Sequence, residues 1–237
     1  MLASKSAPVG VSKSWRESPA VAQECARLLE QHRLGRLLDA GGGNGVLTSY
    51  LLRDRAQDVD DATVLDASRE ALAGVPPDIR AQRGRIEDLT DADGPFGTVL
   101  MRQVLHYVRS PVATLRGVRG RVGAGGALYV GQLVAPDAAA ARWLADKAQW
   151  VSDSRLRVWT IDRLLATLGR AGMYVSRGTL TPHWQSIDAR IAPSLVRPGT
   201  HVRGTMPVHR AGTAVHCRVL WLHALLTPTP DEPEPGF

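Results

Sequence analysis

The stretch from Leu37 to Gly45, LLDAGGGNG, most constrains what this chain can fold into. The apolar run that begins at Leu34 predicts a strand, and the glycine-rich turn after it leads into an expected helix, Val46 to Arg53. Glycine allows backbone conformations closed to other residues, and it removes the Cβ where a ligand must touch the main chain. A strand, a glycine turn and a helix in this order open a doubly wound α/β sheet, whose ligand binds at the carboxyl ends of the strands.

The spacing of the glycines distinguishes several classes of ligand. A dinucleotide-binding loop has the pattern G-x-G-x-x-G, and Val46 stands where its third glycine belongs. A phosphate-binding loop ends in Gly-Lys-Ser/Thr, and no lysine follows Gly45. What remains is an acidic residue, Asp39, followed by glycines at alternate positions, Gly41, Gly43 and Gly45. From this motif alone, the alternative to a ligand-binding loop is a tight strand-to-helix turn that binds no ligand.

A second acidic residue, Asp66, ends the next apolar run, which begins at Ala62. It stands twenty-one residues after Gly45. A carboxylate about 20 positions after such a loop can accept hydrogen bonds from the ribose hydroxyls of a nucleoside. Asp is also common at helix N-termini, so a capping role is the alternative. The loop and this carboxylate together predict a ligand that contains a nucleoside.

The acidic residue with alternating glycines resembles motif I of class I S-adenosylmethionine-dependent methyltransferases. Residues 84–89 resemble the adenine-side motif of that family, with Arg85 in place of its usual Asp. Residues 102–108, RQVLHYV, resemble the motif after strand four in the ubiquinone-biosynthesis-type, small-molecule branch. Residues 123–126 stand where the family has a Gly-Gly turn before a buried strand. The resemblance therefore covers linked motifs from about Leu34 to Val134, and it concerns the fold and the cofactor rather than the substrate.

This resemblance implies a Rossmann-like, doubly wound α/β sheet of seven strands, mostly parallel with an antiparallel last strand, plus a small C-terminal insertion. It implies S-adenosyl-L-methionine as cofactor and S-adenosyl-L-homocysteine as product. A methyl group would move by in-line displacement to an O, N or C atom of a small molecule, for example a secondary metabolite. The residues implied to line the cofactor site are Asp39, Gly41, Gly43, Asn44, Gly45, Asp66, Ala67, Ile86, Glu87, Arg102 and Gln103.

Two other functions fit the same motifs. A protein of this fold can use the charged cofactor for a non-methyl reaction such as cyclisation, and a cofactor-binding protein can lack catalysis altogether. For a catalytic protein, the candidate bases or substrate-orienting residues are His106 and His183, although a lone histidine is more often structural. The aromatic candidates for the substrate site are Trp15, Tyr107, Trp150 and Trp184, for which core packing is the alternative.

We expect three parts along the chain. Residues 1–17 form an N-terminal segment that either folds over the cofactor as a lid or anchors by packing. Residues 18–226 form the methyltransferase domain, with 181–214 as an insertion before the last strand. A loop of this length is expected to be either functional or disordered. Residues 227–237 are rich in proline and acids, and we expect a flexible tail because such a segment buries too little apolar surface to order itself.

The composition limits the partners. The net charge is +6, but acidic residues are interspersed with the arginines and no nucleic-acid-binding motif is visible, so the sequence disfavours a nucleic-acid partner. No window approaches the ~18 unbroken apolar residues of a membrane span. Cys25 and Cys217 lie far apart without metal-ligand spacing, so we expect reduced thiols, no bound metal and a cytoplasmic protein. A homodimer remains open.

Overall fold

The computed structural model describes residues 19–151, 157–188, 208–211 and 214–228, and for some of them, including 146–151, 183–188 and 208–219, only the backbone. The chain divides into two compact units. The larger unit comprises Pro19–Gln132, Asp162–Leu180 and the chain from Leu222 onward. The other includes Leu133–Ile161 and Thr181–Trp221. The expected parts 1–17, 18–226 and 227–237 remain a prediction.

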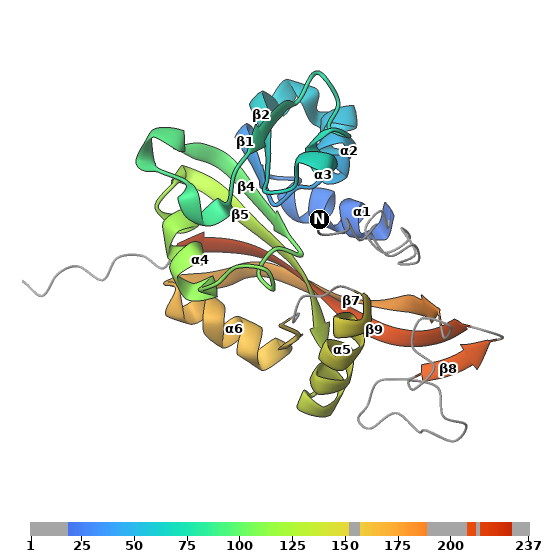
Figure 1. The fold of residues 1–237 in the computed structure, drawn as a ribbon. Helices are drawn as coiled ribbons and strands as arrows, with labels where there is room; N and C mark the ends of the chain where they lie inside the picture. The colour runs from blue at the N-terminus through green and yellow to red at the C-terminus, as the bar shows by residue number, and fades with distance from the viewer. Residues whose placement is uncertain (1–18, 152–156, 189–207, 212–213, 229–237) are drawn as a thin grey trace, which may run out of the picture. The chain divides into compact units, whose positions relative to one another are not determined.

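Parallel strands form the centre of the sheet (Figure 1). Strand β1 (Gly35–Ala40) lies between β2 (Val59–Asp66) and β4 (Phe96–Arg102) and is parallel to both. Strand β3 (Arg80–Arg83) pairs with β2, and β5 (Val122–Ala135) pairs with β4, again in parallel. Because the strands run the same way, their carboxyl ends share one edge of the sheet.

The remaining strands come from the second half of the chain. The order along the sheet is β3-β2-β1-β4-β5-β9-β7, in which β7 is Met173–Asp188 and β9 is Ala214–Pro228. The last strand in the sequence thus lies inside the sheet, and the predicted fold class is confirmed. The short strands β6 (Trp159–Thr160) and β8 (Val208–Ala211) pair with β5 and β9. Strands β8 and β9 are antiparallel, so a hairpin contributes to the predicted insertion.

One face of the sheet is covered by the helices α1 (Pro19–Leu29) and α2 (Val46–Arg55). The apolar stripe of α1 belongs to one core with residues on a single face of the central strands, because side chains alternate between the faces of a strand. This explains the sequence pattern, in which apolar residues recur at helical spacing before Gly35. The members of this core that are at most 2% exposed include Cys25, Leu28, Leu29, Leu37, Leu47, Leu51, Leu100 and Tyr129.

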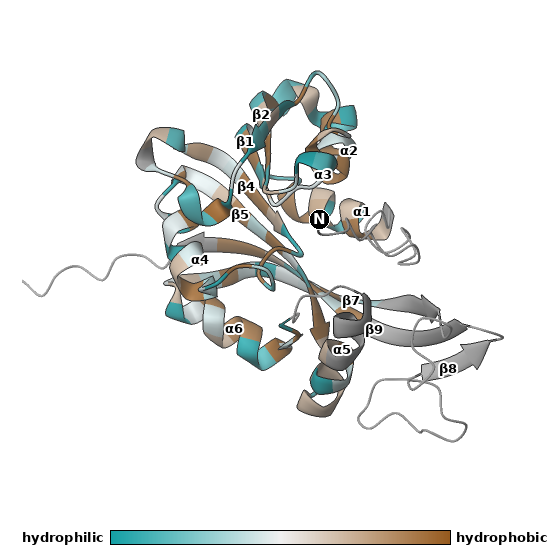
Figure 2. Cartoon of the chain, in the orientation of Figure 1, coloured by the Kyte–Doolittle hydropathy of each residue, from teal (hydrophilic) through white to brown (hydrophobic). Residues whose placement is uncertain are grey.

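The opposite face carries the helices α4 (Pro111–Arg119) and α6 (Ile161–Arg170) (Figure 1). Each helix buries one apolar face, and Figure 2 shows apolar and polar residues on both helices, as amphipathic helices require. The side chain of Arg116 donates to the carbonyl of Arg170 at 2.8 Å and joins the two helices.

The remaining described helices connect the strands. Helix α3 (Arg69–Leu72) and the 3-10 turns at Ala56–Asp58, Ile86–Asp88 and Asp91–Asp93 connect the first strands. In the second unit, α5 (Ala138–Val151) begins after Asp137, whose carboxylate accepts from the Ala140 N–H at 2.8 Å. Among the described residues, no helix has the length and apolar character needed to cross a membrane.

Candidate functional site

The glycine loop lies where β1 ends, at the carboxyl edge of the parallel strands. Gly41, Gly43 and Gly45 all have positive φ, at 73°, 62° and 75°, a region that favours glycine. The N–H of Gly41 donates to the Leu65 carbonyl at 2.7 Å, which ties the loop to the end of β2. A Cβ added at Gly43 would meet nothing within 4 Å. The loop therefore presents bare main chain to open space at this position.

Asp39 lies beneath the loop rather than in it. Its carboxylate is 1% exposed and accepts a hydrogen bond from the Thr48 hydroxyl of α2 at 2.8 Å. A Cβ at Gly42 would come within 2.5 Å of the Asp39 carboxyl carbon, so the loop packs directly on the carboxylate. Burial raises the pKa of Asp39, while the Thr48 hydrogen bond and the charge of Arg102 oppose that rise. Asp39 thus joins β1, the loop and α2.

Asp66 ends β2 beside the loop. One carboxylate oxygen accepts from the Gly43 N–H at 2.9 Å, and the other accepts from the Ser68 N–H at 2.8 Å. The N-cap of α3 is Ser68, whose side chain accepts from the Ala71 N–H. Asp66 therefore supports the start of α3 without being its cap. Each oxygen of a carboxylate has two lone pairs, so both oxygens keep capacity for another donor.

The end of β4 brings three polar side chains together. Gln103 has a positive φ of 54°, which is unusual for a residue other than glycine, and its N–H donates to the Gly131 carbonyl at 2.8 Å. Its Oε1 accepts from Nε2 of Gln132 on β5 at 2.6 Å. The same Nε2 lies 3.2 Å from Nδ1 of His106. Backbone conformations of this kind cluster at functional sites, which directs attention to this edge.

The segment after β3 borders the same end of the sheet, since the Gly84 N–H donates to the Asp66 carbonyl at 3.1 Å. Ile86 is 7% exposed. The Glu87 carboxylate accepts from the Arg109 N–H and from the Arg85 guanidinium, both at 3.2 Å. Burial alone would raise the pKa of Glu87, but the Arg109 N–H and the Arg85 side chain bring it below its ordinary value.

The structure places the other predicted site residues as follows. Asn44 and Ala67 are exposed, and Arg102 ends β4. Tyr107 is 53% exposed, and its ring centroid lies 4.0 Å from that of His106. Trp150 lies in α5, and His183 and Trp184 lie in β7, but their side chains are outside the described residues, as is all of Trp15.

Residues 14–176 match the family described as "Methyltransferase domain". The chain belongs to this methyltransferase family. The match covers the strands and loops that form the candidate site, and it confirms the family inferred from the motifs.

Solved structures share the fold of this methyltransferase domain. A candidate methyltransferase of Bacillus halodurans superposes with a TM-score of 0.71 at 15% identity, covering 88% of this chain and 98% of that one. CalO1, a methyltransferase in calicheamicin biosynthesis solved with S-adenosylhomocysteine, superposes with a TM-score of 0.54 at 16% identity. The superposition covers 89% of this chain and 54% of the CalO1 chain. The [4+2]-cyclase SpnF superposes with a TM-score of 0.56 at 17% identity, covering 89% of this chain and 81% of the SpnF chain.

A relative in sequence is an uncharacterised Synechococcus protein, 29% identical over 132 residues. The matched segment is 52% of this chain and 31% of the relative, so the match spans about a third of the length of that protein.

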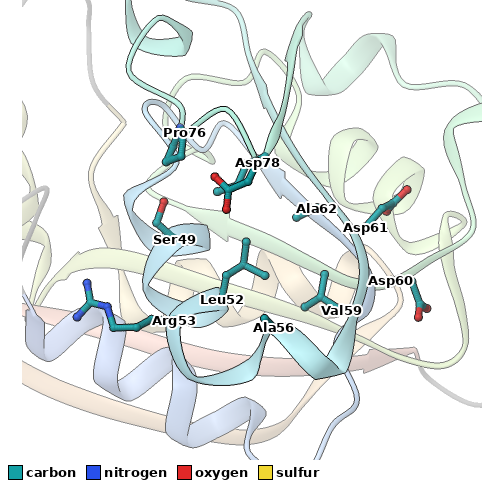
Figure 3. Close-up of a pocket in the computed structure, with 11 residues that line it drawn as sticks. Ser49, Leu52, Arg53, Ala56, Val59, Asp60, Asp61, Ala62, Pro76 and Asp78 are labelled. Carbon is teal, nitrogen blue, oxygen red and sulfur yellow. The ribbon is translucent and has the colours of Figure 1, made fainter.

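A hollow of about 400 Å³ lies away from the site of this methyltransferase domain (Figure 3). It is lined by α2 and by Val59–Ala62, the beginning of β2, so it lies at the opposite end of that strand from Asp66. The carboxylates of Asp60 and Asp61 at its rim form ion pairs with arginines. A second cavity, of about 540 Å³, is lined by residues 85–89 and one face of α4, and it adjoins the expected adenine side.

The sequence motifs did not reveal Gln132 or Thr48. Gln132 is 2% exposed and is the one amide side chain in the run from Ala127 to Val134, which is otherwise apolar apart from the glycine. A single amide in such a run could have indicated a buried polar cluster, because buried polar groups require hydrogen-bond partners. Thr48 has no comparable signal, since threonine is common on helices and only the fold brings it to Asp39.

Proposed function

We propose that this chain is an S-adenosylmethionine-dependent methyltransferase that acts on an O, N or C atom of a small molecule. The observation that carries the proposal is the carboxylate of Asp66, which the N–H groups of Gly43 and Ser68 hold beside the glycine loop at 2.9 and 2.8 Å. A carboxylate oriented before the ligand arrives, next to bare main chain, suits the two hydroxyls of a ribose.

The surroundings fit that cofactor. Open space over Gly43 accommodates a ligand against the backbone, and Ile86 supplies a buried apolar side chain near the end of β3. When bound, S-adenosylmethionine supplies a methyl group already activated on a sulfonium. The protein then contributes mainly position and orientation, which can supply on the order of 7–11 kcal/mol. His106 and Tyr107 are proposed to hold the acceptor, with His106 as either its base or its orienting group.

Calorimetry with S-adenosylmethionine tests the proposal. We expect Asp66→Asn to weaken binding by about tenfold or more, which corresponds to about 1.4 kcal/mol, because an amide can accept on one atom only. Asp61→Asn is the matched control, since Asp61 lies on the same strand with a side chain that is 54% exposed. We expect it to bind with wild-type affinity. An equal effect of both substitutions, or no binding by the wild type, would contradict the proposal.

A second function shares the fold. The structural similarity to SpnF suggests as an alternative that the bound cofactor assists a non-methyl reaction such as cyclisation. A further alternative is a protein that binds the cofactor without catalysing any reaction. Release of S-adenosylhomocysteine during incubation with a panel of O, N and C acceptors separates methyl transfer from both. The membership in the methyltransferase family favours methyl transfer, so this is the function proposed first.

A further inference from the structure

Gln132 is a buried amide at the centre of the polar cluster on β4 and β5. It is 2% exposed, and its side chain contacts two potential acceptors. Its Nε2 lies 2.6 Å from Gln103 Oε1 and 3.2 Å from His106 Nδ1. Its Oε1 is buried and has no hydrogen-bond partner among the described residues. A buried polar group that is left half satisfied requires an explanation.

Two arrangements of the amides are conceivable, because the nitrogen and oxygen of a glutamine side chain exchange places by a half turn. In the first, Gln132 Nε2 uses both hydrogens, one towards Gln103 and one towards His106, and leaves one acceptor without a partner. In the second, Gln103 must turn as well, and the Nε2 of Gln132 would occupy the buried position with two unsatisfied N–H groups. Unsatisfied buried acceptors are tolerated better than unsatisfied buried donors. The first arrangement is therefore favoured.

The backbone of Gln103 holds its side chain against Gln132 in either arrangement. Its N–H donates to the Gly131 carbonyl at 2.8 Å, and Gly131 directly precedes Gln132 on β5. This bond fixes Gln103 in its left-handed conformation with the side chain against Gln132. In the favoured arrangement, Oε1 of Gln103 accepts one hydrogen of Gln132 Nε2, and the other hydrogen points towards the imidazole of His106.

The tautomer of His106 follows from this donor. A neutral imidazole has one nitrogen that donates and one that accepts. When Nδ1 accepts from Gln132, it carries no proton, and the proton of the ring is on Nε2. An imidazole in this state presents a hydrogen-bond donor at Nε2, whereas removal of a proton from a substrate by Nε2 requires a lone pair there.

We propose that Gln132 is a positioning residue that holds His106 as the neutral Nε2–H tautomer. If the chain has the function proposed above, this tautomer makes His106 a hydrogen-bond donor that orients the substrate rather than a base. The substrate class that it fits has a hydrogen-bond acceptor, such as a carbonyl or carboxylate oxygen, beside the methylated atom. That atom is nucleophilic without proton removal by His106.

Nitrogen NMR of the full chain, labelled with ¹⁵N histidine and measured at pH 9, tests the placement of the proton. The His106 signals are assigned by their loss in His106→Gln. We expect Nδ1 at the position of a bare nitrogen and Nε2 at that of a protonated one. Gln132→Leu and Gln132→Met remove the amide at similar size, and both signals should shift towards the averaged positions of exchanging tautomers.

Two further variants sharpen the test. Gln132→Glu supplies a carboxylate that accepts from Nδ1, so the pattern should invert. Thr98→Val is the matched control, because Thr98 is a fully buried polar residue of β4 whose hydroxyl has no partner in the described structure. It should keep the wild-type pattern. A protonated Nδ1 in the wild type, or an unchanged pattern in both the Leu and Met variants, would overturn the proposal.

The readout needs neither cofactor nor substrate, so it is independent of the proposed function. A protein that shows the expected tautomer but does not bind S-adenosylmethionine would retain the role of Gln132 and lose the methyltransferase assignment of the site. A protein that binds the cofactor but shows a protonated Nδ1 would retain the function and lose this inference.

Discussion

Gly43 and Gly125 share a backbone conformation but differ in what lies beside them. Their φ angles are 62° and 72°, and a Cβ at either would meet nothing within 4 Å. Gly43 lies beside Asp66, whereas Gly125 lies near the beginning of β5, at the other end of the parallel strands. Alanine at either position should therefore cost similar stability, roughly 1–2 kcal/mol, because an L residue is strained at positive φ.

Only Gly43→Ala should also affect the ligand. Its Cβ would occupy the space in which we place S-adenosylmethionine, so we expect binding to weaken by about tenfold or more. Gly125→Ala should bind as the wild type does. Urea denaturation measures the strain and calorimetry measures the affinity. Wild-type affinity of Gly43→Ala would show that the ligand does not approach the loop at this residue.

At the scale of elements, the crossover from β1 to α2 depends on a hydrogen bond between Thr48 and Asp39. Both residues are at most 1% exposed, and the hydroxyl donates to the carboxylate at 2.8 Å. Thr48→Val leaves a buried carboxyl group without this donor, so we expect the free energy of unfolding to fall by about 1–3 kcal/mol. Thr98→Val makes the same change at a site that is equally buried and has no partner, and it should cost little. If urea denaturation showed the same decrease in the free energy of unfolding for Thr48→Val and Thr98→Val, the hydrogen bond between Thr48 and Asp39 would have no special role.

At the scale of the whole molecule, a buried histidine joins the last strand to the centre of the sheet. His223 on β9 is fully buried, and its Nδ1 lies 2.8 Å from the Tyr129 hydroxyl of β5. Burial lowers the pKa of His223 from 6.5 to about 4. Between these values the unfolded chain binds more protons than the folded chain. The free energy of unfolding therefore falls as the pH is lowered from about 6.5 to about 4, by at most about 3 kcal/mol.

His223→Asn removes this titration and retains an acceptor for the Tyr129 hydroxyl. We expect the free energy of unfolding of the variant to vary less between pH 5 and 6.5 than that of the wild type, in denaturation series at each pH. Glu24 provides the control. Its hydrogen bond to Arg27 lowers the pKa of Glu24 from 4.5 to about 2, so its contribution is lost only below that window. The negative charge of Glu24 also raises the pKa of His223, so its removal in Glu24→Gln leaves His223 neutral in this window and should keep the wild-type slope. A slope that stays unchanged in His223→Asn would exclude His223 as its source.

The sequence predicted those elements that are specified by residues close together along the chain. The glycines at positions 41, 43 and 45 require positive φ whatever surrounds them, so the turn between β1 and α2 could be recognised directly. Helix α2 was expected at Val46 to Arg53 and extends to Arg55. The place of Asp66 beside the loop could be expected, because its distance from the loop along the chain follows from the length of one strand–helix–strand unit; its role towards a ligand stays a prediction.

By itself, then, the sequence determined the fold class, the family and the position of the loop, because each depends on residue types at short, regular spacing. Only the tertiary structure decided which polar side chains meet. Gln103 and Gln132 are separated by 29 residues, and their contact exists because β4 and β5 pair in one register, Arg102 beside Gly131. Asp39 was expected at the cofactor, yet its carboxylate is buried under the loop against Thr48. A pattern along the chain cannot specify such contacts, since they arise from the packing of distant elements and from the burial that this packing imposes.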